Sequence, residues 1–159
     1  MVGMLQAVKP SVWRSRYDIS SDGRPVTTWQ PSTWRQGGEF ILDGQQFVVR
    51  ANMWGTKFTM STAGGAELAA AEGVGRKQWT VSADRQTFTF QRASIWRSEE
   101  ELIVRGRKAG YVKRVGMWRG DTIADLPVMS LPAQVFVLCL LISRWDAAQA
   151  AASSSAAVS

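Results

Sequence analysis

Few side chains in this sequence could carry out covalent chemistry. It has no histidine and a single cysteine, Cys139, which excludes Ser-His-Asp triads, Cys-His dyads, histidine-bearing zinc sites and any intrachain disulfide. Cys139 lies among leucines, where burial suppresses thiol reactivity. Asp121 and Asp125 are the one close carboxylate pair near a basic stretch, and on an extended segment they lie roughly 13 Å apart, too far to share a substrate atom. We therefore expect no enzymatic activity, no cofactor and no bound metal.

Binding of anions is better supported than catalysis. Lys and Arg number 19 against 13 Asp and Glu, a net charge of +6, which favours acidic partners such as phospholipid or nucleic acid. The densest cluster of cations has no acidic residue among them and comprises Arg105, Arg107, Lys108, Lys113, Arg114 and Arg119. On strands, the first two would point the same way, and a turn at 109–110 would bring Lys113 or Arg114 beside them to hold phosphate groups. The alternative is the solvated outer face of a basic protein, partly offset by the acidic residues 99–101.

The dipeptide Trp-Arg recurs along the chain. It occurs four times, at Trp13-Arg14, Trp34-Arg35, Trp96-Arg97 and Trp118-Arg119. Neighbours in a strand face opposite sides of a sheet, so we expect the tryptophans to pack inside and the arginines to reach solvent. Two alternatives stay open: an aromatic and basic surface for bases or sugars, and anchoring at a membrane interface, where tryptophan is favoured.

Strands must position most of these side chains. From about residue 12 to residue 125, short segments with β character are separated by turn signals, which is typical of a barrel or sandwich. The clearest hairpin joins 39–42 to 46–52 through Asp43-Gly44, a pair suited to a type I′ turn. Residues 57–62 continue the pattern, and we read the alanine-rich residues 66–72 as a further strand.

Two more hairpins are expected downstream. Residues 78–82 pair with 87–92, and their apolar positions alternate with polar ones as in a sheet with one solvated face. The inward positions are Trp79, Val81, Phe88 and Phe90. Residues 102–107 and 111–115 flank Lys108-Ala109-Gly110, where we expect the third turn.

The C-terminal third changes character, because residues 126–143 carry no charge. Ser130 is a suitable N-cap for a helix over 132–145, which would be roughly 21 Å long. Apart from Gln134 and Ser143, this helix is apolar on every side, so it must be enclosed by protein or by lipid. Its apolar stretch is shorter than the roughly 20 residues that a membrane span needs, which favours enclosure by protein.

Short antiparallel strands followed by an all-apolar helix predict a mainly β protein. We expect a closed antiparallel β-barrel of about 12 strands around the C-terminal helix, since closure removes exposed strand edges. One domain should span residues 1–146, followed by an Ala/Ser-rich tail over 147–159 that extends the helix by a turn or two. Residues 1–36 could complete the barrel or form a separate arm; Trp29 and Trp34 favour packing on the body.

The C-terminal segment 111–146 (YVKRVGMWRGDTIADLPVMSLPAQVFVLCLLISRWD) resembles the end of tubby C-terminal-like domains. This superfamily includes the phospholipid scramblase and LURP-one-related proteins. Residues 41–50 (ILDGQQFVVR), followed by 54–60 and a Gly-Gly turn, are similar to the scramblase-type hairpin order. The resemblance covers residues 36–146, and it implies a barrel with a hydrophobic helix at its centre and non-catalytic binding of acidic lipid or of another partner.

We therefore expect a non-enzymatic module that binds anionic phospholipid or phosphoinositide headgroups at a membrane surface. The alternatives are an intracellular protein-interaction or scaffold domain, a basic domain that binds nucleic acid with steep salt dependence, and a membrane-embedded protein. Residues 1–10 lack the pattern of an export signal, and a lone cysteine fits a reducing compartment. We expect a cytoplasmic monomer, located at the inner face of the membrane when lipid is bound.

Overall fold

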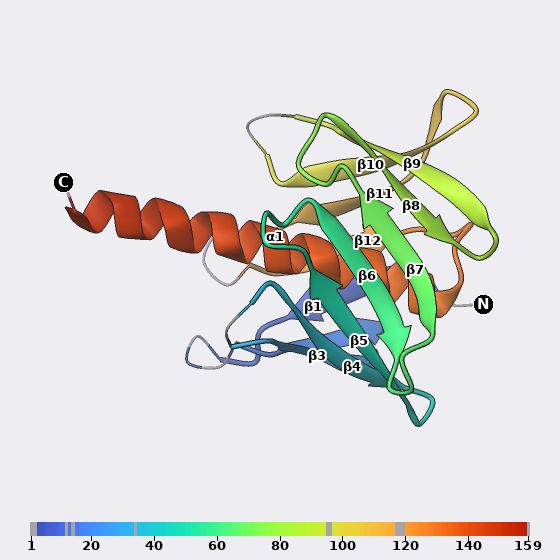
Figure 1. Ribbon diagram of the computed structural model, residues 1–159, viewed down its shortest axis with the longest axis horizontal. Coiled ribbons are helices and arrows are strands. Elements are labelled where there is room, and N and C mark those ends of the chain that lie inside the picture. The colour runs from blue at the N-terminus through green and yellow to red at the C-terminus, as the bar shows by residue number, and fades with distance from the viewer. Residues whose placement is uncertain are drawn as a thin grey trace.

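Each strand of the chain pairs with its sequence neighbour, and the first pairs with the last. The computed structural model describes residues 3–11, 13, 15–33, 35–94, 97–116 and 120–158, with side chains as far as 154. All pairs are antiparallel, and the strand order closes into a single barrel (Figure 1). The expected mainly β fold, a closed antiparallel barrel enclosing the C-terminal helix, is confirmed, with twelve strands.

The N-terminal segment completes the barrel instead of forming a separate arm. The first three strands come from it, β1 pairs with β12 through Leu5 and Ala124, and Trp29 is fully buried. The strands are β1 (Leu5–Val8), β2 (Tyr17–Ser21), β3 (Arg24–Pro31), β4 (Gly37–Leu42), β5 (Gln45–Ala51), β6 (Lys57–Thr62), β7 (Glu67–Glu72), β8 (Gln78–Ala83), β9 (Gln86–Arg92), β10 (Glu99–Val104), β11 (Arg107–Arg114) and β12 (Thr122–Asp125).

The hairpins read from the sequence are confirmed up to β9. In the β4–β5 turn, φ is 51° at Asp43 and 78° at Gly44, as a type I′ turn requires. The alanine-rich segment is indeed a strand, β7. The Trp79 and Phe90 rings of β8 and β9 stack inside the barrel, with centroids 4.6 Å apart.

The third predicted turn was misplaced. The β10–β11 hairpin closes at Arg105 and Gly106, which both have positive φ, whereas Lys108, Ala109 and Gly110 lie within β11. The register shifts between Leu102 and Ile103, so one extra residue of β11 is accommodated as a bulge. Gly110 is needed for the close approach of β12 and not for a turn. A Cβ at this position would overlap the Asp125 carbonyl oxygen.

The helix α1 (Leu131–Val158) begins as predicted and fills the barrel. Ser130 caps it, its Oγ accepting from the Ala133 amide at 3.4 Å. The eight consecutive side chains from Val135 to Ile142 are at most 2% exposed. Both polar exceptions are buried and hydrogen-bonded: Gln134 Nε2 donates to the Met129 carbonyl at 2.8 Å, and Ser143 Oγ accepts from the Gly37 amide at 2.9 Å. Gln134 Oε1 has no partner among the described residues.

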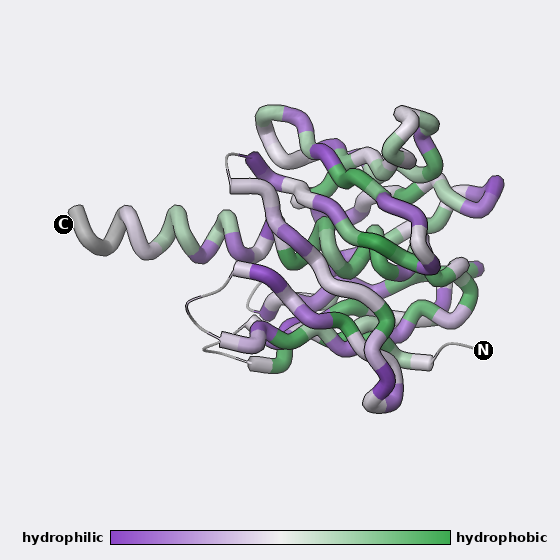
Figure 2. Tube along the Cα trace, turned by 90° about the horizontal axis from the view of Figure 1, so that it is seen from below, coloured by the Kyte–Doolittle hydropathy of each residue, from purple (hydrophilic) through white to green (hydrophobic). Residues whose placement is uncertain are grey.

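The predicted end of the helix was wrong. Instead of stopping within one or two turns of residue 145, α1 continues to Val158 and projects out of the barrel (Figure 1). Alanine has the highest helix propensity, so the alanine-rich segment continues the helix begun in the core. By length and composition, Leu131–Ser154 could cross a membrane. The strongly hydrophobic part of it lies within the barrel (Figure 2).

The antiparallel order sorts the connections into two ends of the barrel. At one end, which we call the turn end, lie the connections 22–23, 43–44, 63–66, 84–85, 105–106 and the approach to α1 over 126–130. At the other, which we call the exit end because α1 leaves the barrel there, lie the connections 9–16, 32–36, 52–56, 73–77, 93–98 and 115–121.

Candidate functional site

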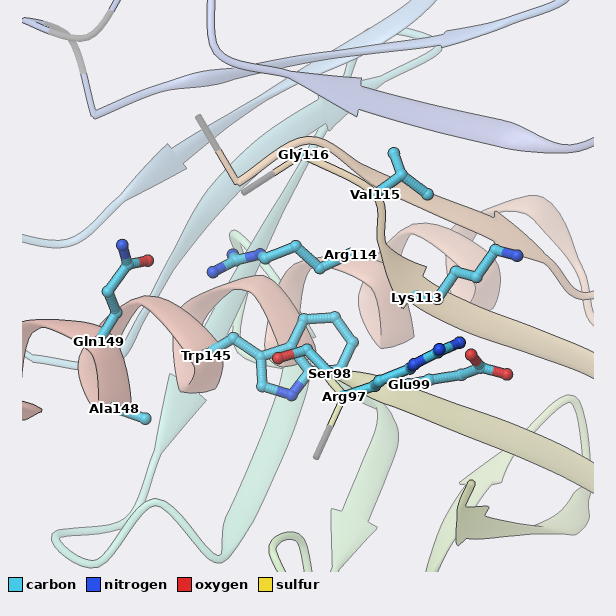
Figure 3. A pocket seen from close by; sticks show the side chains of 10 residues that line it. All are labelled: Arg97, Ser98, Glu99, Lys113, Arg114, Val115, Gly116, Trp145, Ala148 and Gln149. Carbon is cyan, nitrogen blue, oxygen red and sulfur yellow. The ribbon is translucent and has the colours of Figure 1, made fainter. Parts of the chain in front are cut away.

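A surface hollow of about 710 Å³ opens at the exit end, between α1 and the ends of β10 and β11 (Figure 3). Because β10 and β11 are antiparallel neighbours, the start of one and the end of the other present side chains together at this end. Three cations, one carboxylate and one indole are among its lining residues. It is lined by Arg97, Ser98, Glu99, Lys113, Arg114, Val115, Gly116, Trp145, Ala148 and Gln149.

One wall of the hollow is a charged cluster that ties α1 to the barrel. Arg114 Nη2 lies 2.8 Å from Asp146 Oδ1, and the hydroxyl of Tyr17 donates to the same carboxylate at 2.9 Å. The Arg114 guanidinium also lies 5.6 Å from the centre of the Trp145 ring. Burial and the neighbouring Asp146 carboxylate raise the pKa of Tyr17 well above its usual value, so it is a neutral donor. Arg114 therefore holds the helix in place and is largely neutralised.

The other wall carries the more available charges. Arg97 is exposed and has no ion-pair partner among the residues that the structure describes. Lys113 and Arg114 extend to opposite sides of β11, and Lys113 points away from the helix (Figure 3). Its ammonium lies 5.1 Å from the centre of the Tyr111 ring, and it pairs across the sheet with Glu99. An anion can therefore reach Arg97 and Lys113 from solvent, whereas the carboxylate of Glu99 weakens the positive field of these two cations.

A second anchor holds α1 at the same rim. Arg144 Nη1 donates to the Gly55 carbonyl at 2.6 Å, and its guanidinium packs so close to Gly75 that a Cβ there would overlap it. Nearby, the indole of Trp79 donates to Glu100 Oε1 at 2.6 Å. Burial raises the pKa of Glu100, although Arg92 and Arg144 oppose the shift, and burial lowers the pKa of Arg144.

The predicted basic cluster is divided by the fold. Arg105 lies in the β10–β11 turn and Arg107 begins β11, so both sit exposed at the turn end. Lys113 and Arg114 end the same strand at the exit end, roughly 23 Å from Arg107 at 3.3 Å per residue. The expectation that a turn at 109–110 would bring them together was therefore wrong.

The remaining members of that cluster are accounted for separately. Lys108 Nζ lies 3.0 Å from Glu101 Oε2, and this hydrogen bond raises the pKa of Lys108. Its side chain is half exposed and already paired, so it is less available to a ligand than Arg97. Arg119 lies outside the described residues.

The members of the Trp-Arg pairs that the structure describes lie in connections and not in strands. Trp13 is 92% exposed, so its predicted packing inside the barrel was wrong. Trp34, Trp96 and Trp118 lie outside the described residues. Arg35 and Arg97, the second residues of two pairs, belong to the exit-end connections 32–36 and 93–98, as Trp13 belongs to 9–16. For these three residues, the expected alternation within a strand does not apply.

Sequence reasoning missed three contributors to the exit end. Arg97 was left out of the predicted basic cluster and was read as the outward partner of Trp96 or as part of an aromatic and basic surface. Trp145 was read as the end of the helix, and Trp54 was not read as a surface residue. One available signal was the recurrence of the Trp-Arg dipeptide. The contact of Trp145 with Arg114 had no such signal, since it depends on where the helix leaves the barrel.

Charge is distributed unequally between the two ends. Among the described residues of the exit-end connections, the cations are Lys9, Arg16, Arg35, Arg76, Lys77 and Arg97, and the one acid is Asp121. In the turn-end connections the acids are Asp22, Asp43 and Asp84, and the cations are Arg85 and Arg105. The exit end is therefore strongly positive, and the turn end is close to neutral.

The described part of the chain offers little to catalysis. It contains no group of three or more Cys, Asp or Glu side chains placed to hold a metal ion. Cys139 is fully buried in α1, and burial raises the pKa of its thiol well above the usual value. What the hollow can do chemically is bind an anion beside an aromatic ring. No family model matches the chain, and no curated protein or solved structure is significantly similar to it.

Proposed function

We propose that the protein is a non-enzymatic binding module for anionic phospholipid headgroups at a membrane surface. The observation that carries this is the exit-end hollow, where Arg97 and Lys113 face solvent beside Ser98 and Trp145. Two cations and a hydroxyl suit a phosphate group, because charge-assisted hydrogen bonds are about twice as strong as neutral ones. The hollow is open, as a site for a headgroup that remains attached to a bilayer must be.

The chemistry of the site favours binding over turnover. Arg114, the third cation, is paired with Asp146, which also accepts from Tyr17. It therefore holds one wall of the hollow in place, and contact with the ligand is left to Arg97 and Lys113. The cations of the predicted cluster at the turn end, Arg105 and Arg107, take no part in this site. The proposal therefore moves the headgroup site to the opposite end of β11.

The proposal includes a family and a location. The twelve-strand barrel around a hydrophobic helix supports the resemblance of residues 111–146 to tubby C-terminal-like domains. The cytoplasmic leaflet carries most anionic lipid, so we propose that the protein works there as a peripheral module.

The test is co-sedimentation with neutral, phosphatidylserine and phosphoinositide vesicles at two salt concentrations. The variant Arg97→Ser with Lys113→Ser removes two cations from the hollow, and Arg105→Ser with Arg107→Ser removes two from the turn end. We expect the first to weaken binding about thirtyfold, at about 1 kcal/mol for each cation near an anionic surface. The second should weaken it by less than about threefold, because screening acts within about 10 Å.

The two variants have the same net charge, so a difference between them reports position. Equal losses would mean that only total charge matters and would overturn the hollow as the site. A wild-type protein that stays in the supernatant with every vesicle would overturn the lipid function, leaving a protein or nucleic-acid partner to be sought.

A further inference from the structure

Large apolar side chains are displayed at the exit end. Met53 is 87% exposed and Trp54 is 77% exposed in the connection 52–56, and Trp13 is still more exposed in the connection 9–16. A soluble protein usually buries such side chains, and their exposure at one site marks an interaction surface. Tryptophan in particular favours the interface of a bilayer, where its ring is apolar and its N–H is solvated.

The same end has the charge that an anionic bilayer would attract. Its described connections carry the six cations named above against a single acid. The turn end also exposes apolar side chains, but these are aliphatic, as at Ile41 and Leu68, and the connections of that end carry three acids against two cations. Exposed aromatic rings and a positive field therefore coincide at one end of the barrel and not at the other.

The helix supplies the third observation. Beyond Asp146, α1 continues for twelve residues, about 18 Å, along the exit side with no charged residue in its sequence. Its amide N–H groups donate to carbonyl oxygens one turn earlier in the helix, and serine hydroxyls can bond back to the preceding turn. Since each charge at mid-bilayer costs roughly 2.5–3.5 kcal/mol, a charge-free segment is the kind that lipid admits.

We infer that the exit end docks on an anionic bilayer, with Trp13, Met53 and Trp54 at the interface and the helical segment 150–158, beyond the hollow, within the lipid. This inference takes the identity of the ligand from the proposed function. It adds the orientation of the barrel on the membrane and the depth to which α1 enters the lipid. The geometry requires both parts together: α1 projects past the rim (Figure 1), so the exit end can face a membrane squarely only if the segment enters it. The nine residues 150–158 rise about 14 Å, a length that a leaflet of about 15 Å accommodates.

The buried single cysteine makes this inference testable in the full chain. Cys139 is fully enclosed, so an introduced surface thiol can be labelled selectively, with the wild-type chain as the blank. Met53→Cys and Ala152→Cys place an environment-sensitive fluorophore on the rim and on the projecting helix. Ile41→Cys, at a side chain 61% exposed near the turn end, is the matched control. The probe surface is a vesicle of phosphatidylcholine and phosphatidylserine, with and without brominated acyl chains.

The expected result is blue-shifted emission at positions 53 and 152, quenched by brominated chains, with no change at 41. A second measurement uses no label: Trp13→Ser with Trp54→Ser should weaken vesicle binding at least about tenfold, since burying one large apolar side chain contributes roughly 1.5–3 kcal/mol. Ile41→Ser with Leu68→Ser, the turn-end counterpart, should leave it within about twofold.

The outcomes separate this inference from the proposed function. Wild-type protein could sediment with anionic vesicles while the emission at positions 53 and 152 does not change, or while the emission at position 41 changes equally. In either case the docking orientation is wrong and the headgroup function stands. If the wild-type protein sediments with no vesicle, both fail, and the exposed tryptophans are then assigned to a protein partner.

Discussion

At the turn end, four connections have only two residues each, whereas at the exit end every connection has five to eight. Asp22-Gly23 and Asp43-Gly44 have positive φ throughout, so their residue types are dictated by backbone geometry. The longer exit-end connections are under no such constraint, and they hold the exposed tryptophans and most of the cations. The comparison indicates that one end of this barrel is specified by folding, while the other is available for binding.

The two ends also secure the helix differently. At the turn end, Asp84 accepts from the amide of Ser130 at 2.8 Å and from its hydroxyl at 2.6 Å, where the positive N-terminus of α1 favours a carboxylate. At the exit end, Asp146 is shared by Arg114 and Tyr17. The first contact is exposed, and the second is partly buried and borders the proposed site.

Asp146→Ala should produce the largest effect on stability. Arg114, with a side chain 12% exposed, and the Tyr17 hydroxyl would both lose their acceptor, which should cost about 2–3 kcal/mol in urea denaturation. The freed Arg114 should also strengthen binding to anionic vesicles, by about fivefold.

The control for that change is Asp18→Ala, which removes an exposed pair with Arg16 at 3.7 Å on the neighbouring part of β2. It should cost less than about 1 kcal/mol, so it serves as the control for stability. Reduced affinity in Asp146→Ala would show that the carboxylate supports the ligand, contrary to the proposed division of roles.

Asp84→Ala should have an intermediate effect, about 1–2 kcal/mol, because it removes two acceptors at the helix N-terminus and leaves alanine at φ 55°. Asp84→Asn retains an acceptor and tolerates positive φ, so it should cost less than half as much. Neither change should alter vesicle binding. If either weakens it as much as the loss of Arg97 and Lys113 does, the functional distinction between the ends fails.

Glu100→Gln should have the smallest effect, visible as a pH dependence. Burial raises the pKa of Glu100 above 4.5, so the folded state holds the proton more tightly than the unfolded state does. Between pH 4.5 and that raised pKa, the contribution of this group to stability falls as pH rises. Glutamine does not ionise and can still accept from Trp79.

The measurement is urea denaturation of both proteins at about pH 4 and about pH 7. The stability of the variant relative to wild type should be higher at the second pH. A constant difference would mean that Glu100 does not titrate differently in the folded state, and that its contact with the indole of Trp79 offsets its burial.

Much of the fold could be predicted because it follows from local patterns. Alternation of Trp79 and Val81 against Phe88 and Phe90 predicts a half-buried hairpin, and Asp43-Gly44 predicts its kind of turn. The misplaced β10–β11 turn shows the limit of such reasoning. Arg105-Gly106 and Lys108-Ala109-Gly110 are comparable turn signals, and the choice depends on the pairing of β11 with β12, where Gly110 is required.

The order of residue types predicts a mainly β chain with an apolar helix that has to be enclosed, since residues 126–143 offer no charge to solvent. Which cations are available to a ligand depends on how the barrel closes. Tyr17 and Asp146 are 129 positions apart, and Arg114 and Asp146 are 32 apart, yet barrel closure brings all three together. The same closure leaves Arg97 without an ion-pair partner among the described residues and separates Arg107 from Arg114, because antiparallel strands send alternate connections to opposite ends.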